Sequence, residues 1–293
     1  MKIKLPSYLK VLLKLAITAA ALFFVFRKID FREMGGHMLR SDPWLLLVAL
    51  GLFILSKAVS SVRLNRYLQA IGIRITERSN MKLYLLGMYY NLFLPGGIGG
   101  DGYKIYLLTK KFSVKTSRIF WAVLMDRFIG VLALFCMVVG GFYFVDLLLD
   151  YRVFIWALIP LGVLAAWLVF RIFFPYLLKV FLITNLQSLV VQVLQLVSAW
   201  LILLALGHQQ QPEAYLLVFL VSSIVAVLPV TIGGIGSREF TFMLGARWLH
   251  LDLNLSIALS LLFYLITAFT SLWGIIYSLG PGINLAERQV RGN

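Results

Sequence analysis

The sequence predicts an all-α integral membrane protein with about six transmembrane helices, two re-entrant Leu-Pro-Gly-rich hairpins and an inverted internal repeat. The first observation is composition: 61% of the 293 residues are apolar, 13% are charged, and the mean hydropathy is +0.92. A soluble domain is about half apolar and about a quarter charged, which excludes an ordinary soluble enzyme or a nucleic-acid binder. The second observation is a set of long apolar runs, and the third is a glycine-rich motif that occurs twice. The net charge of +15 lies mostly between the apolar runs, a pattern typical of membrane topology and of anionic lipid as a partner.

Apolar runs of transmembrane length account for most of the chain. A helix needs about 20 residues to cross a hydrocarbon core about 30 Å thick, because each residue rises about 1.5 Å. The first run follows several lysines like a signal peptide, but no small-residue cleavage site ends it, so we expect it to remain as a span. The predicted spans are Tyr8–Phe26, Pro43–Val62, Ile119–Val145, Val153–Phe170, Leu186–Leu206 and Leu253–Leu279.

Two further apolar stretches are too short to cross a bilayer alone. Met81–Leu94 and Tyr215–Leu228 would each reach only about 20 Å as helices, and each ends in Leu-Pro followed by glycines. A short apolar run that then breaks is expected of a re-entrant segment. The predicted hairpin breaks are Pro95, Gly99, Gly100, Pro229, Gly233 and Gly234.

The distribution of cations predicts the orientation. With the N-terminus inside and both short stretches returning to their side of entry, eighteen Lys and Arg residues fall in the cytoplasm, among them Arg63, and seven fall outside. The positive-inside rule therefore favours a multi-pass protein of the cytoplasmic (inner) membrane with both termini in the cytoplasm.

The glycine-rich motif indicates an internal repeat. Leu94–Gly102 and Leu228–Gly236 are 134 residues apart and match at six of nine positions. Within a single membrane domain, 1–293, the halves 8–145 and 153–280 each contain three crossings. Because three is odd, the second half would insert upside down, as in many secondary transporters. The alternative is two unrelated glycine-rich loops.

The repeat pairs two cations that follow the breaks. Lys104 aligns with Arg238, and each is expected near the start of a short helix capped by Asp101 or Ser237. A cation there opposes the helix dipole, so its occurrence in both halves indicates that an anion such as a lipid phosphate binds between them. The alternative is that both side chains only face lipid headgroups.

Other polar residues within the spans extend this hypothesis. Arg127 lies within a span and needs a buried partner or water, so we expect it to line a polar cavity. Asp101 and Glu239 are better partners for it than the adjacent Asp126, which lies about 100° around the helix. The alternative is that Arg127 belongs to a purely structural ion pair. Lys57 is expected to extend its stem to the cytoplasmic surface. Two polar stripes predict a wet interior or close helix packing. They consist of Ser188, Gln192 and Gln195, the glutamines suiting a headgroup, and of Ser256, Ser260, Tyr264, Thr267 and Ser271.

No cofactor or metal site is predicted. Gly97, Gly99 and Gly102 match the dinucleotide pattern literally, but no βαβ unit surrounds them. The three histidines share no ligand spacing, and no nucleophile with its base is evident, so we expect a non-enzymatic protein. The histidines are His37, His208 and His250.

The motifs resemble one known family over about Lys10 to Gly280. Leu-Pro-x-x-Ile-Gly-Gly-Asp followed by a cation, Asp126-Arg127 within a span, and Gly233–Glu239 are similar to the lysylphosphatidylglycerol synthase transmembrane, or flippase-like, family. The resemblance implies a lipid flippase that moves an anionic phospholipid or a lipid-linked sugar. Thirteen residues follow Gly280, so the soluble aminoacyl-transfer domain of the full-length synthase is expected to be absent. The alternatives are a lipid-modifying enzyme with Asp101, Asp126 or Glu239 as a base, and an accessory subunit of a glycosyltransferase or aminoacyl-lipid synthase system.

Overall fold

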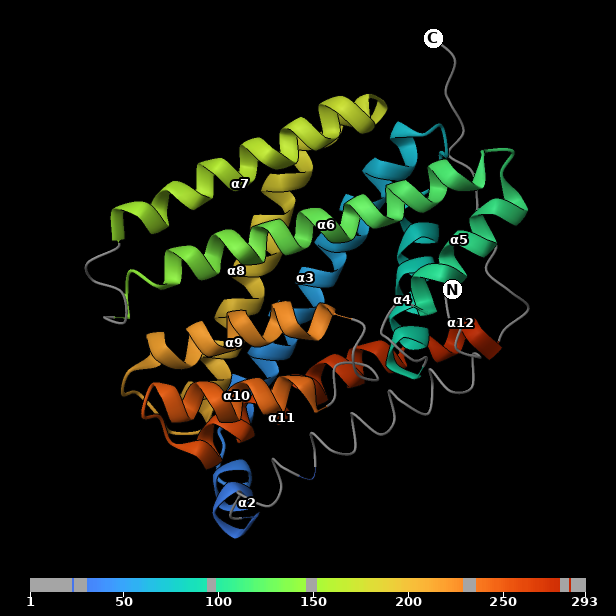
Figure 1. The fold of residues 1–293 in the computed structure, drawn as a ribbon. Coiled ribbons are helices and arrows are strands. Elements are labelled where there is room, and N and C mark those ends of the chain that lie inside the picture. Colours follow the sequence, from blue (N-terminus) through green and yellow to red (C-terminus); the bar gives the residue numbers. More distant parts are fainter. Residues whose placement is uncertain are drawn as a thin grey trace, which may run out of the picture.

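The described chain is a bundle of α-helices without β-strands. The computed structural model describes residues 23, 31–93, 99–145, 152–228, 236–279 and 285. Figure 1 shows long helices crossing the molecule, with shorter helix pairs at both ends of the bundle. The helices are α2 Phe31–Leu39, α3 Pro43–Ala70, α4 Glu77–Phe93, α5 Gly99–Lys111, α6 Thr116–Gly141, α7 Arg152–Phe173, η2 Pro175–Val180, α8 Phe181–Ala205, α9 Pro212–Val227, α10 Ser237–Trp248, α11 Leu253–Leu272 and α12 Ile275–Leu279.

Five helical segments in the described ranges are long and apolar enough to span a membrane, and they correspond to five of the six predicted spans. The remaining prediction, Tyr8–Phe26, lies outside the described residues apart from Phe23. The segments are Pro43–Ala70, Thr116–Gly141, Ile155–Phe173, Pro175–Ala205 and Leu253–Ser278.

Two predicted boundaries differ from the structure. Helix α3 continues beyond Val62 to Ala70, so Arg63 lies within the helix and not in a cytoplasmic loop. The helix ends where Gly72 adopts φ +93°. The amide of Gly72 then donates to the Gln69 carbonyl at 3.1 Å and that of Ile73 donates to the Leu68 carbonyl at 2.9 Å, a Schellman termination.

The last apolar run is not one helix, because α11 ends at Leu272 and α12 begins at Ile275. Gly274 lies between them against α4, where a Cβ atom would come within 2.3 Å of the Leu85 carbonyl oxygen. The glycine therefore permits the backbone of the last run to pass directly over α4.

The two short apolar stretches form helix pairs with the short helices that follow them. Helix α4 packs on α5, and α9 packs on α10. Gly100 lies so close to Gly87 that a Cβ atom on Gly100 would meet the Gly87 carbonyl oxygen at 1.8 Å. Of the predicted breaks, Gly99 and Gly100 are the first residues of α5, whereas Pro95, Pro229, Gly233 and Gly234 lie outside the described residues. Re-entry into the membrane stays a prediction for both pairs.

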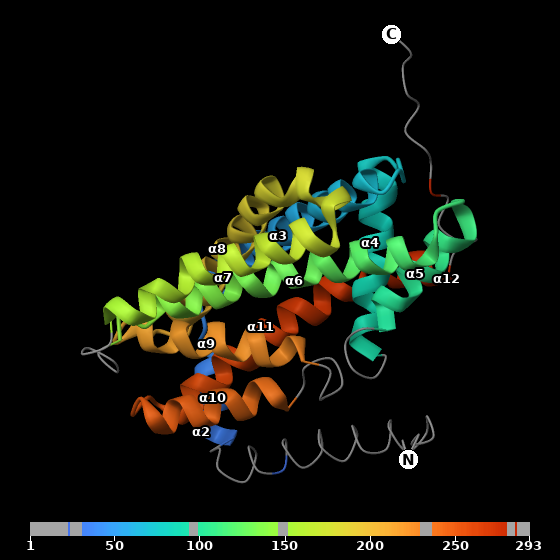
Figure 2. The same ribbon diagram turned by 45° about the horizontal axis from the view of Figure 1, so that its top comes forward.

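The helix pairs lie at different ends of the bundle. In Figure 1 α4 and α5 are at the right and α9 and α10 at the lower left, and the turned view of Figure 2 agrees. Asn91 near the end of α4 and Val227 at the end of α9 nevertheless line the same cavity. The tips of the two pairs therefore reach a common space from different ends.

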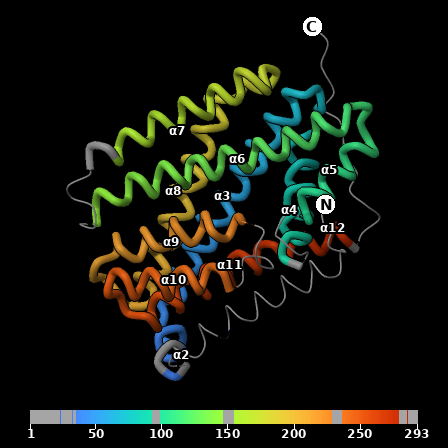
Figure 3. The backbone as a smooth tube through the Cα atoms, in the orientation of Figure 1, coloured from blue at the N-terminus to red at the C-terminus, as the bar shows by residue number. Residues whose placement is uncertain are grey.

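Buried apolar side chains form two separate clusters. One contains Phe53 of α3 and Ile202 of α8 with residues of α9, α10 and α11. The other contains Leu68 of α3 and Phe181 of α8 with residues of α5, α6, α7 and η2. Helices α3 and α8 pack along one another and run through both clusters (Figure 3). Polar residues between the two clusters therefore lie in the middle of the bundle.

Candidate functional site

The site is a cavity of about 320 Å³ between the two apolar clusters. Helices α3, α4, α5, α6, α8, α9, α10 and α11 all contribute to its lining. Its volume is within the range of small-molecule sites, about 300–1,000 Å³. Five cations and two carboxylates give the lining a net charge of +3. The charged residues are Lys57, Arg63, Lys104, Arg127, Arg238, Asp101 and Asp126.

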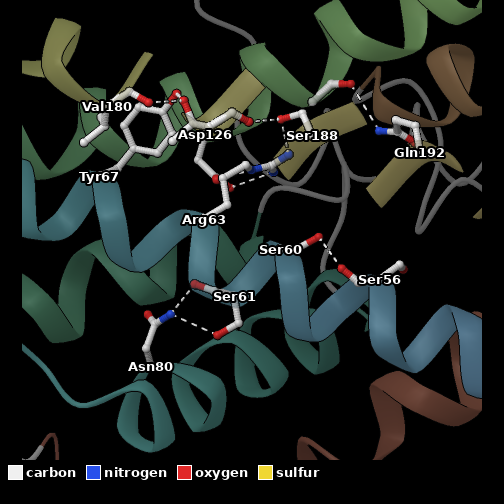
Figure 4. A network of polar contacts seen from close by, with 12 residues as sticks. Ser56, Ser60, Ser61, Arg63, Tyr67, Asn80, Asp126, Val180, Ser188 and Gln192 are labelled. Atoms are coloured by element: carbon white, nitrogen blue, oxygen red, sulfur yellow. Dashed lines mark hydrogen bonds and ion pairs between the residues drawn. The ribbon is translucent and has the colours of Figure 1, made fainter. Parts of the chain in front are cut away.

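A buried ion pair joins α3 to α6. Nε of Arg63 donates to Oδ1 of Asp126 at 2.7 Å, and Nη2 donates to Oδ2 at 3.2 Å. The remaining guanidinium nitrogen, Nη1, donates to Oγ of Ser188 on α8 at 2.7 Å (Figure 4). Arg63 is 5% exposed and Asp126 is 7% exposed. One guanidinium therefore ties three helices together where the two clusters meet.

The sequence prediction missed this pair because it ended the second span at Val62. A signal was present: Ser56, Ser60, Arg63 and Tyr67 recur at spacings of four, three and four residues. Such spacing places all four side chains on one helix face and continues past the end of the apolar run. A polar face that extends through a charged segment indicates a helix extending with it.

A second carboxylate holds the α4/α5 pair to α6. Oδ1 of Asp101 accepts a hydrogen bond from Nζ of Lys104 at 3.0 Å, and its Oδ2 accepts from Nε of Arg127. Of the two predicted partners of Arg127, Asp101 binds it, whereas Glu239 bonds the Gly236 amide and the Ser260 hydroxyl. Lys104 also lies 4.5 Å from the ring centroid of Tyr84. Gly87 leaves room for this lysine, since a Cβ atom there would lie 2.1 Å from Cε of Lys104.

The start of α10 is capped by an acidic side chain. Oε2 of Glu239 accepts from the Gly236 amide at 2.7 Å, and Oε1 accepts from Oγ of Ser260 at 2.9 Å. Gly236 is the N-cap and has no side-chain oxygen, so the third helical residue supplies one. Glu239 is the one predicted headgroup residue that does not line the cavity.

The predicted N-caps are wrong for both short helices. Helix α5 begins at Gly99, and its third residue, Asp101, points to cations instead of capping. Oδ1 of Asn91 on α4 accepts from the Gly100 amide at 2.8 Å. Ser237 is the first residue of α10 and follows the N-cap. At the start of α5 the acceptor for a backbone amide is thus Asn91 of the neighbouring helix α4. At the start of α10 it is Glu239 of the same helix.

Lys57 and Arg238 rest on aromatic rings within the cavity. Nζ of Lys57 lies 4.4 Å from the ring centroid of Phe53. The guanidinium of Arg238 lies 4.9 Å from that of Phe263 and 5.6 Å from that of Phe219. The expectation that Lys57 extends to the surface is wrong, because its side chain lines the cavity in the middle of α3. The two cations therefore add positive charge to the interior.

The two polar stripes differ in their contacts. Gln192 and Gln195 both line the cavity, and Nε2 of Gln192 donates to the Gly130 carbonyl at 3.2 Å. In the other stripe Thr267 lines the cavity, whereas the hydroxyls of Ser256 and Ser271 donate to carbonyls of their own helix. The α8 stripe thus faces the cavity, and most of the α11 stripe serves packing.

Six of the seven predicted headgroup residues meet at one cavity, although they lie on four helices. They are Asp101, Lys104, Arg127, Gln192, Gln195 and Arg238. Chemically, this lining offers several cationic donors and two amides to an anion with many oxygen acceptors.

The chain was compared with models of protein families and with curated proteins. The family model described as "Lysylphosphatidylglycerol synthase TM region" matches residues 11–185 and 176–274. A search of curated proteins found no match.

Proposed function

Because the chain belongs to the lysylphosphatidylglycerol synthase TM region family, we propose that it moves an anionic phospholipid or a lipid-linked sugar between the leaflets of the membrane. Family membership and the apolar helices make it a multi-pass membrane protein with a lipid-related role. The proposal of transport between leaflets is based on the geometry of the cavity.

The observation that carries the proposal is the position of the basic cavity between two apolar clusters. On α3, Lys57 and Arg63 lie between Phe53 of one cluster and Leu64 of the other. A charge at this depth in a membrane costs several kcal/mol unless it is paired or hydrated. A lining with a net charge of +3 therefore favours an anionic group that passes through the middle of the bundle.

The two helix pairs suggest how access could alternate. The base of the α4/α5 pair is fixed to α3, since Nδ2 of Asn80 donates to the carbonyl and hydroxyl oxygens of Ser61 (Figure 4). Near its tip, Asp101 on α5 is bound by Arg127 on α6. A phosphate that competes with Asp101 for Lys104 and Arg127 would release the tip while the base stays anchored. The α9/α10 pair would serve the other leaflet if the halves form the predicted inverted repeat.

We also propose that the chain lies in the cytoplasmic membrane with both termini in the cytoplasm. The cluster at the Leu68 end of α3 is bordered by many cations, as the positive-inside rule expects of a cytoplasmic end. These cations are Arg74, Arg78, Lys110, Lys111, Lys115, Arg118, Arg171 and Lys179.

The carboxylate contacts favour transport over a lipid-modifying enzyme. A general base must be within hydrogen-bond reach of the proton that it abstracts. Asp126 is engaged by Arg63, Asp101 by two cations, and Glu239 by the Gly236 amide and the Ser260 hydroxyl. All three oxyanions are already used to hold the fold together.

Leaflet exchange in reconstituted vesicles tests the proposal. Vesicles containing fluorescent phosphatidylglycerol and the purified protein should lose more fluorescence to an external quenching reductant than protein-free vesicles. Arg127→Gln should abolish the increase, and Lys115→Gln, an exposed position outside the cavity, should retain it. Exchange equal to that of protein-free vesicles contradicts transport. Altered lipid mass would indicate an enzyme, and activity only with a co-purified synthase would indicate an accessory subunit.

A further inference from the structure

Two cations of the cavity have no carboxylate partner within the described part of the chain. The ion pairs found there engage Arg63, Lys104 and Arg127, but neither Lys57 nor Arg238. The connecting segments 94–98 and 229–235 contain no Asp or Glu, so the hairpin connections supply no further carboxylate. Within the described residues, neither Lys57 nor Arg238 is therefore neutralised by an ion pair with an acidic side chain.

A row of aromatic rings positions these two cations. The Phe53 and Phe263 rings meet edge to face with centroids 5.4 Å apart, and the Phe263 and Phe219 centroids are 4.6 Å apart. Lys57 lies over the first ring, and Arg238 lies over the other two. Aromatic faces attract cations without neutralising them. The row therefore holds both cations at the cavity while leaving their charge available.

The repeat alignment shows that the two hairpins differ in charge. In the first motif Asp101 precedes Lys104 by three residues and binds it. In the second motif the position aligned with Asp101 is Ile235, three residues before Arg238. Glu239 follows Arg238, but it caps α10 and bonds Ser260. The first hairpin thus carries its own counter-charge beside its cation, and the second does not.

We propose that Lys57 and Arg238 bind a phosphate-containing headgroup that carries two negative charges, so that the lipid is a phosphomonoester or a diphosphate. The lining has a net charge of +3. A dianion reduces this excess to one positive charge, whereas a phosphodiester with one negative charge leaves two, so the lining favours the dianion. This inference rests on the proposed function, because it assumes that a lipid enters the cavity. It specifies the chemical class of that lipid's headgroup.

Binding of short-chain lipids to the purified full chain at pH 8 tests the charge requirement. Dioctanoyl phosphatidic acid, a phosphomonoester, should bind at least tenfold more tightly than dioctanoyl phosphatidylglycerol, a phosphodiester. Lys57→Gln and Arg238→Gln should each weaken phosphatidic acid binding by about tenfold, because each removes one charge-assisted contact. The double variant should bind the two lipids alike. Lys115→Gln removes an equal charge outside the cavity and should leave the preference unchanged.

Two controls separate the site from folding and from a free anion. Neither cation has an ion pair to lose, so both Gln variants should unfold at or above the parental temperature. Pyrophosphate should compete only weakly with phosphatidic acid, because it has no chains. Mass spectrometry of lipids that co-purify with the unmodified chain should show enrichment of phosphomonoester or diphosphate lipids.

The inference is overturned if phosphatidic acid and phosphatidylglycerol bind within twofold of each other, or if the double variant keeps the preference. Competition by pyrophosphate at the concentration of the lipid also overturns it, because a free phosphate compound would then be the ligand. Failure of the proposed transport would give a different result. The chain would still prefer phosphatidic acid to phosphatidylglycerol, and the Gln variants would still lose that preference, but vesicles would show no leaflet exchange. Exchange without any headgroup preference leaves transport intact and removes only the present inference.

Discussion

Asp126 and Arg127 are adjacent on α6, yet they bind different parts of the molecule. Asp126 accepts from Arg63 on α3, whereas Arg127 donates to Asp101 on α5. Successive residues of an α-helix point about 100° apart, so one turn of α6 connects the central helix packing to the tip of the α4/α5 pair. Binding of an anion to Arg127 would therefore act on the hairpin without disturbing the Arg63–Asp126 pair.

The Arg63–Asp126 pair should be structural. Asp126→Asn leaves Arg63 with its charge buried, and removal of one partner from a buried pair costs about 3–5 kcal/mol. We expect the variant to unfold at lower temperature in detergent. Arg63→Met combined with Asp126→Leu should recover much of the loss, because no unpaired charge remains. A double variant less stable than Asp126→Asn would contradict this account.

Arg127→Ala should abolish leaflet exchange with a smaller loss of stability than Asp126→Asn. The Arg127 side chain is 27% exposed, and Asp101 keeps Lys104 as a partner after the substitution. Exchange assays and thermal unfolding on the same preparations measure both effects. Normal exchange by a folded Arg127→Ala variant would remove this residue from the transport path.

Gly87→Ala should reduce transport through Lys104. The added Cβ atom would lie 2.1 Å from Cε of Lys104, so the lysine must leave its position beside Asp101. We expect weaker binding of anionic lipid by about tenfold, since one charge-assisted contact is displaced. Gly102→Ala, on α5 beside Lys104, has open space around its Cβ position and serves as the matched control. Equal binding by both variants would show that Lys104 does not contact the lipid.

Glu239→Gln should lower stability but not lipid affinity. Glu239 caps α10 and lies outside the cavity lining, and a hydrogen bond to a charged group contributes about 1.5–3 kcal/mol. Thermal unfolding should therefore shift, while binding of phosphatidic acid to the folded fraction stays within twofold of the parent. A large loss of affinity would show that Glu239 takes part in lipid binding.

Single cysteines in a Cys136→Ser background should define the topology. Arg74→Cys before α4 and Ser113→Cys after α5 are exposed and should react only with reagent added from the cytoplasmic side. Gln210→Cys, before α9, should react only from the opposite side. Reaction of positions 74 and 113 from opposite sides would show that α4 and α5 together cross the membrane, and the inverted repeat would then fail.

The sequence by itself determined the class of the protein and pointed to six of the polar residues that line its cavity. Apolar length predicts spans because the bilayer has a fixed thickness, and five of the predicted spans are helices of suitable length. The repeat predicts that Lys104 and Arg238 occupy equivalent positions. The cost of a buried cation predicts a partner for Arg127, of which Asp101 is one candidate. All four line the cavity, although the binding roles, the inverted repeat and the orientation stay predictions.

Only the tertiary structure decided which charges are paired and which are free to attract an anion. Arg63 belongs to a basic segment that hydropathy assigns to a loop, and it is buried because α3 continues and meets Asp126, 63 residues away. Lys57 lies over the Phe53 ring at the cavity, and Glu239 is held away from it by the Gly236 amide and the Ser260 hydroxyl. Hydropathy and periodicity report the length and faces of each helix separately. The charge of the cavity depends on which faces pack together, and that is set by contacts between distant parts of the chain.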